Sequence, residues 1–209
     1  MALFSDIESF FNVKNRLRGL VLLLVFSSFG LSATPILILG DSLSASYGMP
    51  ENQGWVQLLR EKMPNSSIIN GSVSGETSAG GLRRLPALLE SAQPKILLIE
   101  LGGNDGLRGF PPKQLKNNLT KIIELAKAQQ VKVLLSEIMV PPNYGPRYAS
   151  QINTVYKDLA TEHDVTLMPF FMEQIVIDPS LMQRDGIHPN QKAQIIIAEF
   201  MLPWFEQAL

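Results

Sequence analysis

The chain has 209 residues, of which 45% are hydrophobic and 18% are charged, and its formal net charge is -1 at pH 7. A chain of this length and hydrophobicity can bury a sizeable core in one globular domain, and its near-neutral charge gives no electrostatic reason to expect a nucleic-acid partner. The absence of cysteine excludes disulfides, a cysteine nucleophile and a thiolate metal site.

Residues 1–33 differ in composition from the rest of the chain. Three basic residues, Lys14, Arg16 and Arg18, precede the apolar stretch "GLVLLLVFSSFGLSA", which ends at Ala33. This order of basic, apolar and small residues is typical of a signal peptide. A buried helix or a short membrane anchor is the alternative, but the apolar run is shorter than the roughly 20 residues of a comfortable span. We predict cleavage near Ala33, a periplasmic or secreted location and no stable membrane span after processing.

After the leader, short apolar runs alternate with longer segments of helical spacing. The runs that predict strands are "PILIL" (35–39), "SSII" (66–69), "KILLIEL" (95–101), "VKVLLSEI" (131–138) and "VTLMPF" (165–170). The segments that predict helices are 55–63, 79–92, 112–130, 148–163 and the residues after the cap Asn190, with Pro86 marking a kink or a late start in the second. This alternation predicts one α/β domain, residues 34–209, built from parallel βαβ units with helices on both faces of the sheet.

Short motifs follow the predicted strands, where ligands bind in open parallel sheets. They are "GDSL" (40–43), "SGETS" (74–78), "GGND" (102–105) and "DGIHP" (185–189). Each of them has a simpler structural interpretation as a helix cap or a turn. Their joint occurrence at successive strand ends is what those simpler interpretations do not explain.

The motifs contain the groups that nucleophilic catalysis requires. The Ser42 hydroxyl is a weak nucleophile unless a positioned base removes its proton. His188 is a candidate base, and Asp185, three residues earlier, can hold the imidazole in one tautomer. An Asp-Gly turn with an incidental histidine is the alternative. The other histidine, His163, lies at a predicted helix end, where a solvated side chain is the simpler interpretation.

An oxyanion hole needs donors that are oriented before charge develops. The backbone N–H of Ser42 points outward at the start of a helix or turn. Gly75 lets a backbone N–H approach a ligand without an intervening Cβ. The Asn104 side chain offers two N–H donors at the next strand end. A helix cap, a turn glycine and a turn asparagine are the respective alternatives.

Ser42, Gly75, Asn104 and His188 stand in the order and contexts of the SGNH hydrolases, also called the GDSL family. The resemblance extends from Thr34 to Leu209, and "ILGDSLSASYGM", "GGNDGLRG", "NYGPRY" and "PFFMEQI" resemble its exported bacterial thioesterase, arylesterase and lysophospholipase subgroup. The resemblance implies a flavodoxin-like three-layer α/β/α fold with about five parallel strands.

The same resemblance implies a division of roles among the motif residues. Ser42 is the nucleophile, His188 the base and Asp185 its orienter, while the backbones of Ser42 and Gly75 and the side chain of Asn104 form the oxyanion hole. The substrate is then a small acyl ester or thioester, with no metal or cofactor, and we expect a monomer. The motif "GDSLS" departs from the nucleophile elbow of α/β-hydrolases, because leucine stands where that elbow has its second glycine.

An acyl substrate requires an apolar groove. The loops 106–112 and 139–148 are best placed to line it, and Leu107, Phe110, Met139 and Tyr144 are the candidates. Two other functions stay open at this point. A carbohydrate esterase that removes acetyl groups would use the same residues, and a flavodoxin-like binding module would hold an anion on the N–H groups after Gly40. The binding module leaves Asp185 and His188 without a role.

Overall fold

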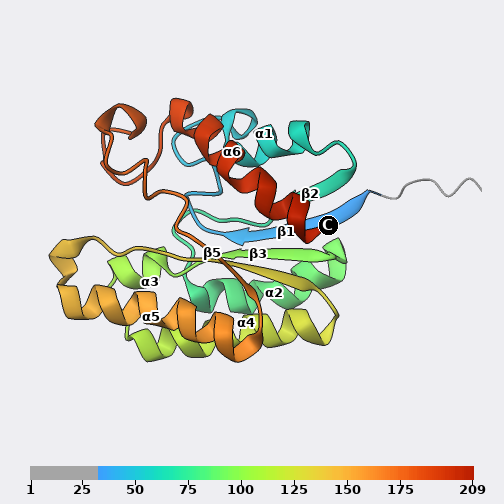
Figure 1. Cartoon of the computed structure of the whole chain (residues 1–209), viewed down its shortest axis with the longest axis horizontal. Coiled ribbons are helices and arrows are strands. Elements are labelled where there is room, and N and C mark those ends of the chain that lie inside the picture. The colour runs from blue at the N-terminus through green and yellow to red at the C-terminus, as the bar shows by residue number, and fades with distance from the viewer. Residues whose placement is uncertain (1–32) are drawn as a thin grey trace, which may run out of the picture. The chain divides into compact units, whose positions relative to one another are not determined.

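The computed structural model describes residues 33–209, so the predicted leader lies outside the described residues apart from Ala33. A five-stranded parallel sheet forms the centre, in the order β2-β1-β3-β4-β5 (Figure 1). The strands are β1 (Thr34–Gly40), β2 (Ser66–Asn70), β3 (Ile96–Glu100), β4 (Lys132–Ser136) and β5 (Thr166–Met168). The α/β class and the sheet of about five strands are therefore confirmed.

Helices cover both faces of this sheet (Figure 1). One face carries α1 (Trp55–Lys62) and α6 (Gln191–Ala208), and the other carries α2 (Ser78–Ala92), α4 (Pro112–Ala128) and α5 (Pro146–His163). The shorter elements are α3 (Gly103–Leu107) and the 3-10 turns η1 (Glu51–Gln53), η2 (Pro142–Tyr144) and η3 (Pro179–Leu181). Within residues 33–209, none of the helices combines the length and apolar character that crossing a membrane requires.

The central strands are apolar on both sides, as a doubly covered sheet requires. Along β1, Leu37 and Leu39 pack toward α2, α4 and α5, while Ile36 and Ile38 pack toward α1 and α6. All four side chains are fully buried. Because successive side chains of a strand point to opposite faces, a continuous apolar run serves two cores at once. The carboxyl end of β1 is therefore held rigidly between two helical layers.

Three local features bear on the expectations, and two of them, in α2 and α3, differ from what was predicted. Helix α2 begins at Ser78, because the Thr77 hydroxyl caps it by accepting a bond of 3.2 Å from Gly80 N, and it continues through the exposed Pro86. Ser42 begins a turn, which is one of the two alternatives expected for it. The short helix α3 was not predicted, since "GGND" carries two glycines of low helix propensity.

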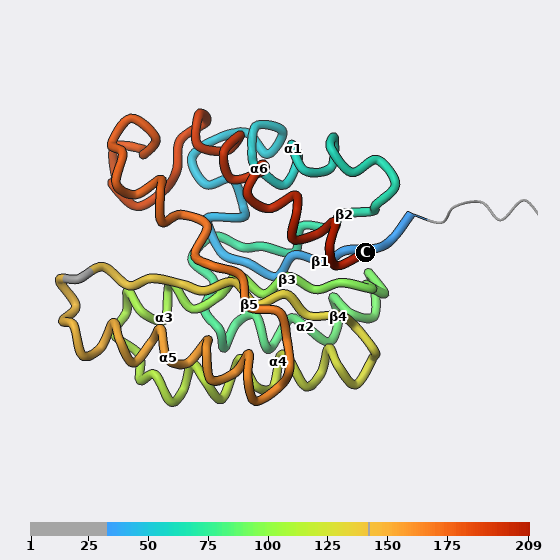
Figure 2. Tube along the Cα trace, viewed as in Figure 1, coloured from blue at the N-terminus to red at the C-terminus, as the bar shows by residue number. Residues whose placement is uncertain are grey.

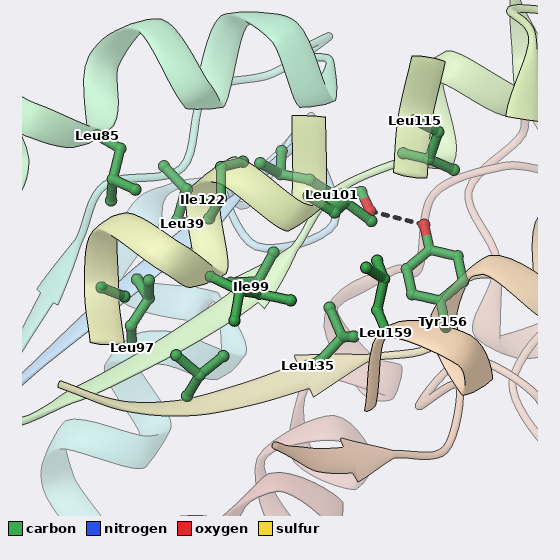
Figure 3. Close-up of a cluster of buried hydrophobic side chains, with 14 of the residues drawn as sticks. Leu39, Leu85, Leu97, Ile99, Leu101, Leu115, Ile122, Leu135, Tyr156 and Leu159 are labelled. Atoms are coloured by element: carbon green, nitrogen blue, oxygen red, sulfur yellow. Dashed lines mark hydrogen bonds between the residues drawn. The ribbon is translucent and has the colours of Figure 1, made fainter. Parts of the chain in front are cut away.

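The end of β3 is fixed by a buried tyrosine of α5. The Tyr156 hydroxyl donates a hydrogen bond of 2.8 Å to the carbonyl of Leu101, as Figure 3 shows among the surrounding leucines and isoleucines. The next residue, Gly102, has φ +118°, and a Cβ there would lie 2.0 Å from the tyrosine oxygen. Only glycine satisfies both conditions. The core thus determines where α3 starts and where Asn104 is placed.

Candidate active site

Ser42 lies directly beyond the carboxyl end of β1, at the start of a turn over residues 42–48. The turn is closed by backbone bonds from Ala45 N to Asp41 O, at 3.0 Å, and from Tyr47 N to Ser42 O, at 3.3 Å. The loop that follows β5 approaches this turn from the far end of the chain, and Figure 2 shows the light-blue turn and the orange-red loop on the same side of the sheet. Tertiary structure therefore brings together two segments that are remote in sequence.

Three side chains form a continuous hydrogen-bonded row across these segments. The Nε2 atom of His188 lies 2.9 Å from the Oγ atom of Ser42. The Nδ1 atom of the same ring lies 2.7 Å from Oδ2 of Asp185. This geometry suits an imidazole that donates its Nδ1 hydrogen to the carboxylate and accepts the serine hydrogen at Nε2. Ser42, His188 and Asp185 are thus joined as a nucleophile, a base and an orienting carboxylate would be.

The electrostatic state of Asp185 follows from its hydrogen bonds. Partial burial would raise its pKa, but donation from the His188 backbone N–H, the His188 ring and the Ile187 backbone N–H outweighs burial and lowers the pKa to about 2. The two backbone bonds are each 3.0 Å long and end on Oδ1, which leaves Oδ2 for the ring. Asp185 is therefore an ionised, fixed partner for the imidazole at neutral pH.

Asn104 also faces this site. It lies in α3, next to the pocket that contains Ser42, and its Nδ2 donates a bond of 3.0 Å to Oδ2 of Asp41. That bond fixes the amide and uses one of its two N–H groups, leaving the other for a ligand.

Gly75 is held close to the same strand edge but is not among the described residues that line the pocket. Its φ of +77° is one that glycine adopts without strain. The loop containing it runs beside the end of β1, because Val73 N donates to Gly40 O at 3.1 Å. The carbonyl of Gly75 accepts a bond of 3.0 Å from Nη2 of Arg108. The backbone N–H of Gly75 is therefore set by contacts on both sides of the loop.

A pair of buried carboxyl groups lies beneath Ser42. Glu100, at the end of β3, accepts from Asp41 N at 3.2 Å and from the Ser44 hydroxyl at 2.7 Å. Burial raises the pKa of Glu100 well above its usual range, and the neighbouring charge of Asp41 adds to the effect. Burial also raises the pKa of Asp41 to about 6, although the hydrogen bonds from Leu43 N and Asn104 act to lower it. These two groups hold the turn in place from below.

A pocket of about 480 Å³ opens beside Ser42 and His188. Most of its wall is apolar, and the apolar residues are Leu43, Leu107, Ile138, Met139, Val140, Pro141, Phe170, Met172, Val176 and Ile187. They come from the loops that follow β1, β3, β4 and β5. An apolar cavity that ends on a serine hydroxyl suits an acyl chain better than a sugar.

The structure places the four predicted groove residues differently. Leu107 and Met139 line the pocket, whereas Phe110 and Tyr144 lie outside its described lining. Tyr144 turns its hydroxyl to the carbonyl of Leu107, at 2.8 Å, and so braces the wall from behind. The Phe110 backbone is held by Tyr148, whose hydroxyl donates to its carbonyl at 2.7 Å.

The pocket wall contains residues that sequence reasoning missed. Phe170, Met172 and Val176 follow the last strand, in and just beyond the stretch "PFFMEQI". The rule that ligands meet the loops after parallel strands points to this loop, but it does not tell which of the loop's side chains enter the pocket. His163 ends α5, where its carbonyl accepts a bond from Lys127, and it does not line the pocket. Over residues 33–209, no group of three or more His, Cys, Asp or Glu has the arrangement of a metal site.

Comparison with known proteins identifies the family. The profile of the GDSL-like Lipase/Acylhydrolase family matches residues 38–194. The thioesterase 1/protease 1/lysophospholipase L1 of Escherichia coli K12 is 50% identical over 171 residues, which cover 81% of this chain and 82% of that protein. An arylesterase of Vibrio mimicus is 46% identical over 190 residues, covering 89% and 95% of the two chains.

A solved structure agrees with these sequence relatives. The psychrotrophic esterase EstA from a Pseudoalteromonas species, in a form inhibited by monoethylphosphonate, is 48% identical with a TM-score of 0.79. The match covers 82% of this chain and 96% of that one. The family match spans all four motifs at the strand ends. The chain therefore belongs to the GDSL-like lipase and acylhydrolase family, the SGNH hydrolases that its motifs resemble.

Proposed function

We propose that this protein is a serine hydrolase that cleaves acyl esters and thioesters through an acyl-enzyme formed on Ser42. The observation that carries the proposal is the row of hydrogen bonds from Ser42 through His188 to Asp185, at 2.9 and 2.7 Å, at the mouth of an apolar pocket. Family membership and the names of the relatives, an arylesterase and a thioesterase with lysophospholipase activity, support the same reaction class.

In the first half of the reaction, His188 Nε2 takes the hydroxyl proton as Ser42 Oγ attacks the substrate carbonyl carbon. Asp185 stabilises the imidazolium that results and keeps the ring in position. The carbonyl oxygen becomes negative and is stabilised by the N–H groups of Ser42, Gly75 and Asn104. Collapse of the tetrahedral intermediate expels the alcohol or thiol, which takes the proton from His188.

In the second half, a water molecule replaces the leaving group. His188 accepts a proton from this water as its oxygen attacks the acyl carbon. The second tetrahedral intermediate uses the same oxyanion donors. Its collapse breaks the bond to Ser42 Oγ, which recovers its proton from His188 as the carboxylic acid is released. No step requires a group that the chain does not itself supply.

The apolar wall of the pocket suggests the class of substrate. The acyl chain would lie against the side chains of Leu107, Met139, Phe170 and Met172, while the head group stays toward solvent. Lysophospholipids, aryl esters and acyl thioesters all have this form, with acyl-CoA as a convenient thioester in vitro. A deacetylase acting on sugars would need polar partners, so the apolar wall favours the longer acyl chains.

We further propose that residues 1–33 direct export and are removed near Ala33. The proposal rests on the basic, apolar and small segments described above. In a periplasmic or secreted location the enzyme would meet lysophospholipids more often than acyl-CoA. The intact mass of the protein isolated from its native host tests this directly. A mature chain that still begins at Met1 would contradict it.

Covalent labelling tests the proposed chemistry. A fluorophosphonate should add one phosphonyl group to the protein, and peptide mass analysis should place it on Ser42. Ser42→Ala should remove the label, while Ser91→Ala, at an exposed helical serine, should leave it. An unlabelled protein would favour the binding module. A labelled protein that cleaves only short acetyl esters would favour the carbohydrate esterase.

A further inference from the structure

Gln183 joins the two catalytic segments, although it does not line the pocket. Its side-chain Nε2 donates one hydrogen bond of 2.7 Å to the carbonyl of Tyr47 and another of 3.1 Å to the carbonyl of Pro189. The first bond spans 136 positions and ends on the turn that holds Ser42. The second ends on Pro189, the residue after His188. The carbonyl of His188 in turn accepts a hydrogen bond of 2.8 Å from Gln183 N. One amide therefore uses both of its hydrogens to connect the two segments.

Tyr47 completes this connection on the other side of the histidine. Its ring packs on the imidazole of His188, with ring centroids 4.1 Å apart and planes inclined by 30°. Its backbone N–H donates to the carbonyl of Ser42. Tyr47 is thus bonded through its backbone to Ser42 and Gln183 and contacts the base through its ring. Tyr47 is half-exposed, with 47% of the residue accessible, and it is not among the buried residues of either core cluster.

The backbone next to Tyr47 accommodates the amide closely. Gly48 has φ +75°, and a Cβ there would lie 2.4 Å from Oε1 of Gln183. A side chain at this position would be strained and would displace the amide. Glycine at position 48 therefore permits the contact between Gln183 and the turn.

A base that must meet two partners at once needs its ring plane fixed. The bonds to Asp185 and Ser42 lie along the ring edge and leave the imidazole free to tilt about the line that joins them. Apart from an isolated antiparallel bridge between Met182 and Pro189, the segment from Phe170 to Pro189 has only turns, bends and one 3-10 turn, so no helix or strand holds it. A face-on contact restricts tilt, and an amide bonded to both segments restricts their separation. Together these contacts supply the restraints that the three catalytic side chains lack.

We propose that Tyr47 and Gln183 are positioning residues for the His188 base. Gln183 sets the distance between the serine turn and the histidine loop, and the Tyr47 ring holds the imidazole in line with Ser42 and Asp185. The inference rests on the proposed function for its catalytic consequence. Misplacing a reacting group by about 1 Å can cost about 10²-fold in rate, so loss of either restraint is expected to lower kcat by about 10- to 100-fold.

Two pairs of variants isolate the two contacts. Gln183→Met removes both side-chain donors at nearly constant volume, and Gln114→Met makes the same exchange at an exposed position in α4. Tyr47→Leu removes the ring, whereas Tyr47→Phe retains it. We expect Gln183→Met and Tyr47→Leu to lower kcat, measured per active site titrated with fluorophosphonate, with little change in KM. The control Gln114→Met should match the unmodified chain. Tyr47→Phe should turn over much faster than Tyr47→Leu.

Imidazole NMR supplies a readout that does not depend on substrate. The chain has two histidines, so a protein labelled with ¹⁵N-histidine shows two rings, and His163→Gln assigns them. His188 is expected as a single Nδ1–H tautomer in the unmodified chain and as an average of both tautomers in Gln183→Met and Tyr47→Leu. A merely structural role would lower the melting temperature without changing the tautomer or the turnover of each titrated site.

The outcomes separate this inference from the proposed function. An unmodified chain that is labelled at Ser42, with both variants retaining full kcat and a fixed tautomer, overturns the inference alone. An unmodified chain that is not labelled overturns the proposed function, and the tautomer measurement still decides whether Tyr47 and Gln183 position the ring. If Gln183→Met does not fold, the comparison of Tyr47→Leu with Tyr47→Phe decides, because that side chain is half-exposed.

Discussion

Carboxyl groups lie on two sides of Ser42, and their pKa values are shifted in opposite directions. Asp185 lies near the surface, where N–H donors overcome the effect of partial burial and lower its pKa to about 2. Asp41 and Glu100 lie beneath the serine, where burial raises the pKa of Asp41 to about 6 and that of Glu100 well above its usual range. The chemistry of the side chain is the same in all three, so the difference comes from water and hydrogen-bond donors.

Proximity to Ser42 along the chain does not decide which carboxyl group contacts the imidazole. Asp41 is the sequence neighbour of Ser42, yet its oxygens accept hydrogen bonds from Leu43 N and Asn104 Nδ2. Asp185 is distant in sequence, yet it contacts the ring of His188. The Asp185 carboxylate, in contact with the ring, can stabilise an imidazolium, whereas Asp41 and Glu100 accept hydrogen bonds from the backbone and side chains of the serine turn.

The largest effect is expected from breaking the row at Ser42 or His188. Because the serine acts only with its base, Ser42→Ala, His188→Ala and the double variant should each lose a similar amount of kcat, on the order of 10⁶-fold. Steady-state kinetics on the three proteins measures this. Single losses that multiply in the double variant would rule out a shared step. His163→Ala should keep turnover near normal, because that residue lies at the far end of α5.

The next effect compares the two kinds of aspartate directly. Asp185→Asn should lower kcat by up to about 10⁴-fold, since an amide does not fix the same tautomer. It should also move the acid limb of kcat/KM to lower pH, because the imidazolium loses its anion. Asp41→Asn should cost less activity and move that limb less, because Asp41 interacts with His188 electrostatically whereas Asp185 also accepts a hydrogen bond from its ring. Equal effects of the two changes on the pH profile would remove the distinction between the surface and buried carboxyl groups.

A smaller loss is expected at Asn104, which lies between the two regions. As an oxyanion donor, it strengthens its bond only when the carbonyl oxygen becomes negative, so Asn104→Ala should lower kcat and leave KM roughly unchanged. One such donor typically contributes about 10²–10³ in kcat, or roughly 2.7–4 kcal/mol. Kinetics and thermal melting on the same sample separate this from lost folding. A folded variant with near-normal kcat would exclude Asn104 from the mechanism.

The smallest effect on turnover is expected at Glu100, and its readout is stability. Its pKa is raised in the folded state, so the native protein binds more protons than the unfolded chain above the ordinary value of 4.5, and the free energy of unfolding falls as the pH rises from there. Glu100→Gln should flatten that fall. Denaturant unfolding from pH 4 to pH 8 measures it.

The matching measurement on Asp185 has the opposite sign. Its pKa is lowered in the folded state, so its stabilising contribution is complete above the ordinary value of 3.8 and is lost as the pH falls toward about 2. Asp185→Asn should remove that acid loss and leave the region above pH 5 unchanged. The contribution of each carboxyl group is the difference in unfolding free energy between the unmodified chain and its variant, followed against pH. If the two contributions changed with pH in the same direction, the carboxyl groups would not differ as described.

Local sequence was sufficient for the sheet and for the motif positions. Apolar runs such as 35–39 and 131–138 predicted buried strands because a strand covered on both faces must be apolar at every position. The parallel order then required the motif residues to gather at one edge. Both inferences depend on short-range pattern and on chain geometry, and the family resemblance strengthened them without replacing them.

Tertiary structure alone decided the rest. The wall residues Phe170, Met172 and Val176 became visible only when the loop after β5 folded against those after β3 and β4. The pKa of Glu100 depends on complete burial next to Asp41, and the bond from Gln183 to Tyr47 joins positions 136 apart. Burial, electrostatic coupling and long-range hydrogen bonds depend on which segments meet in space. The spacing of motifs along the chain does not by itself predict these contacts.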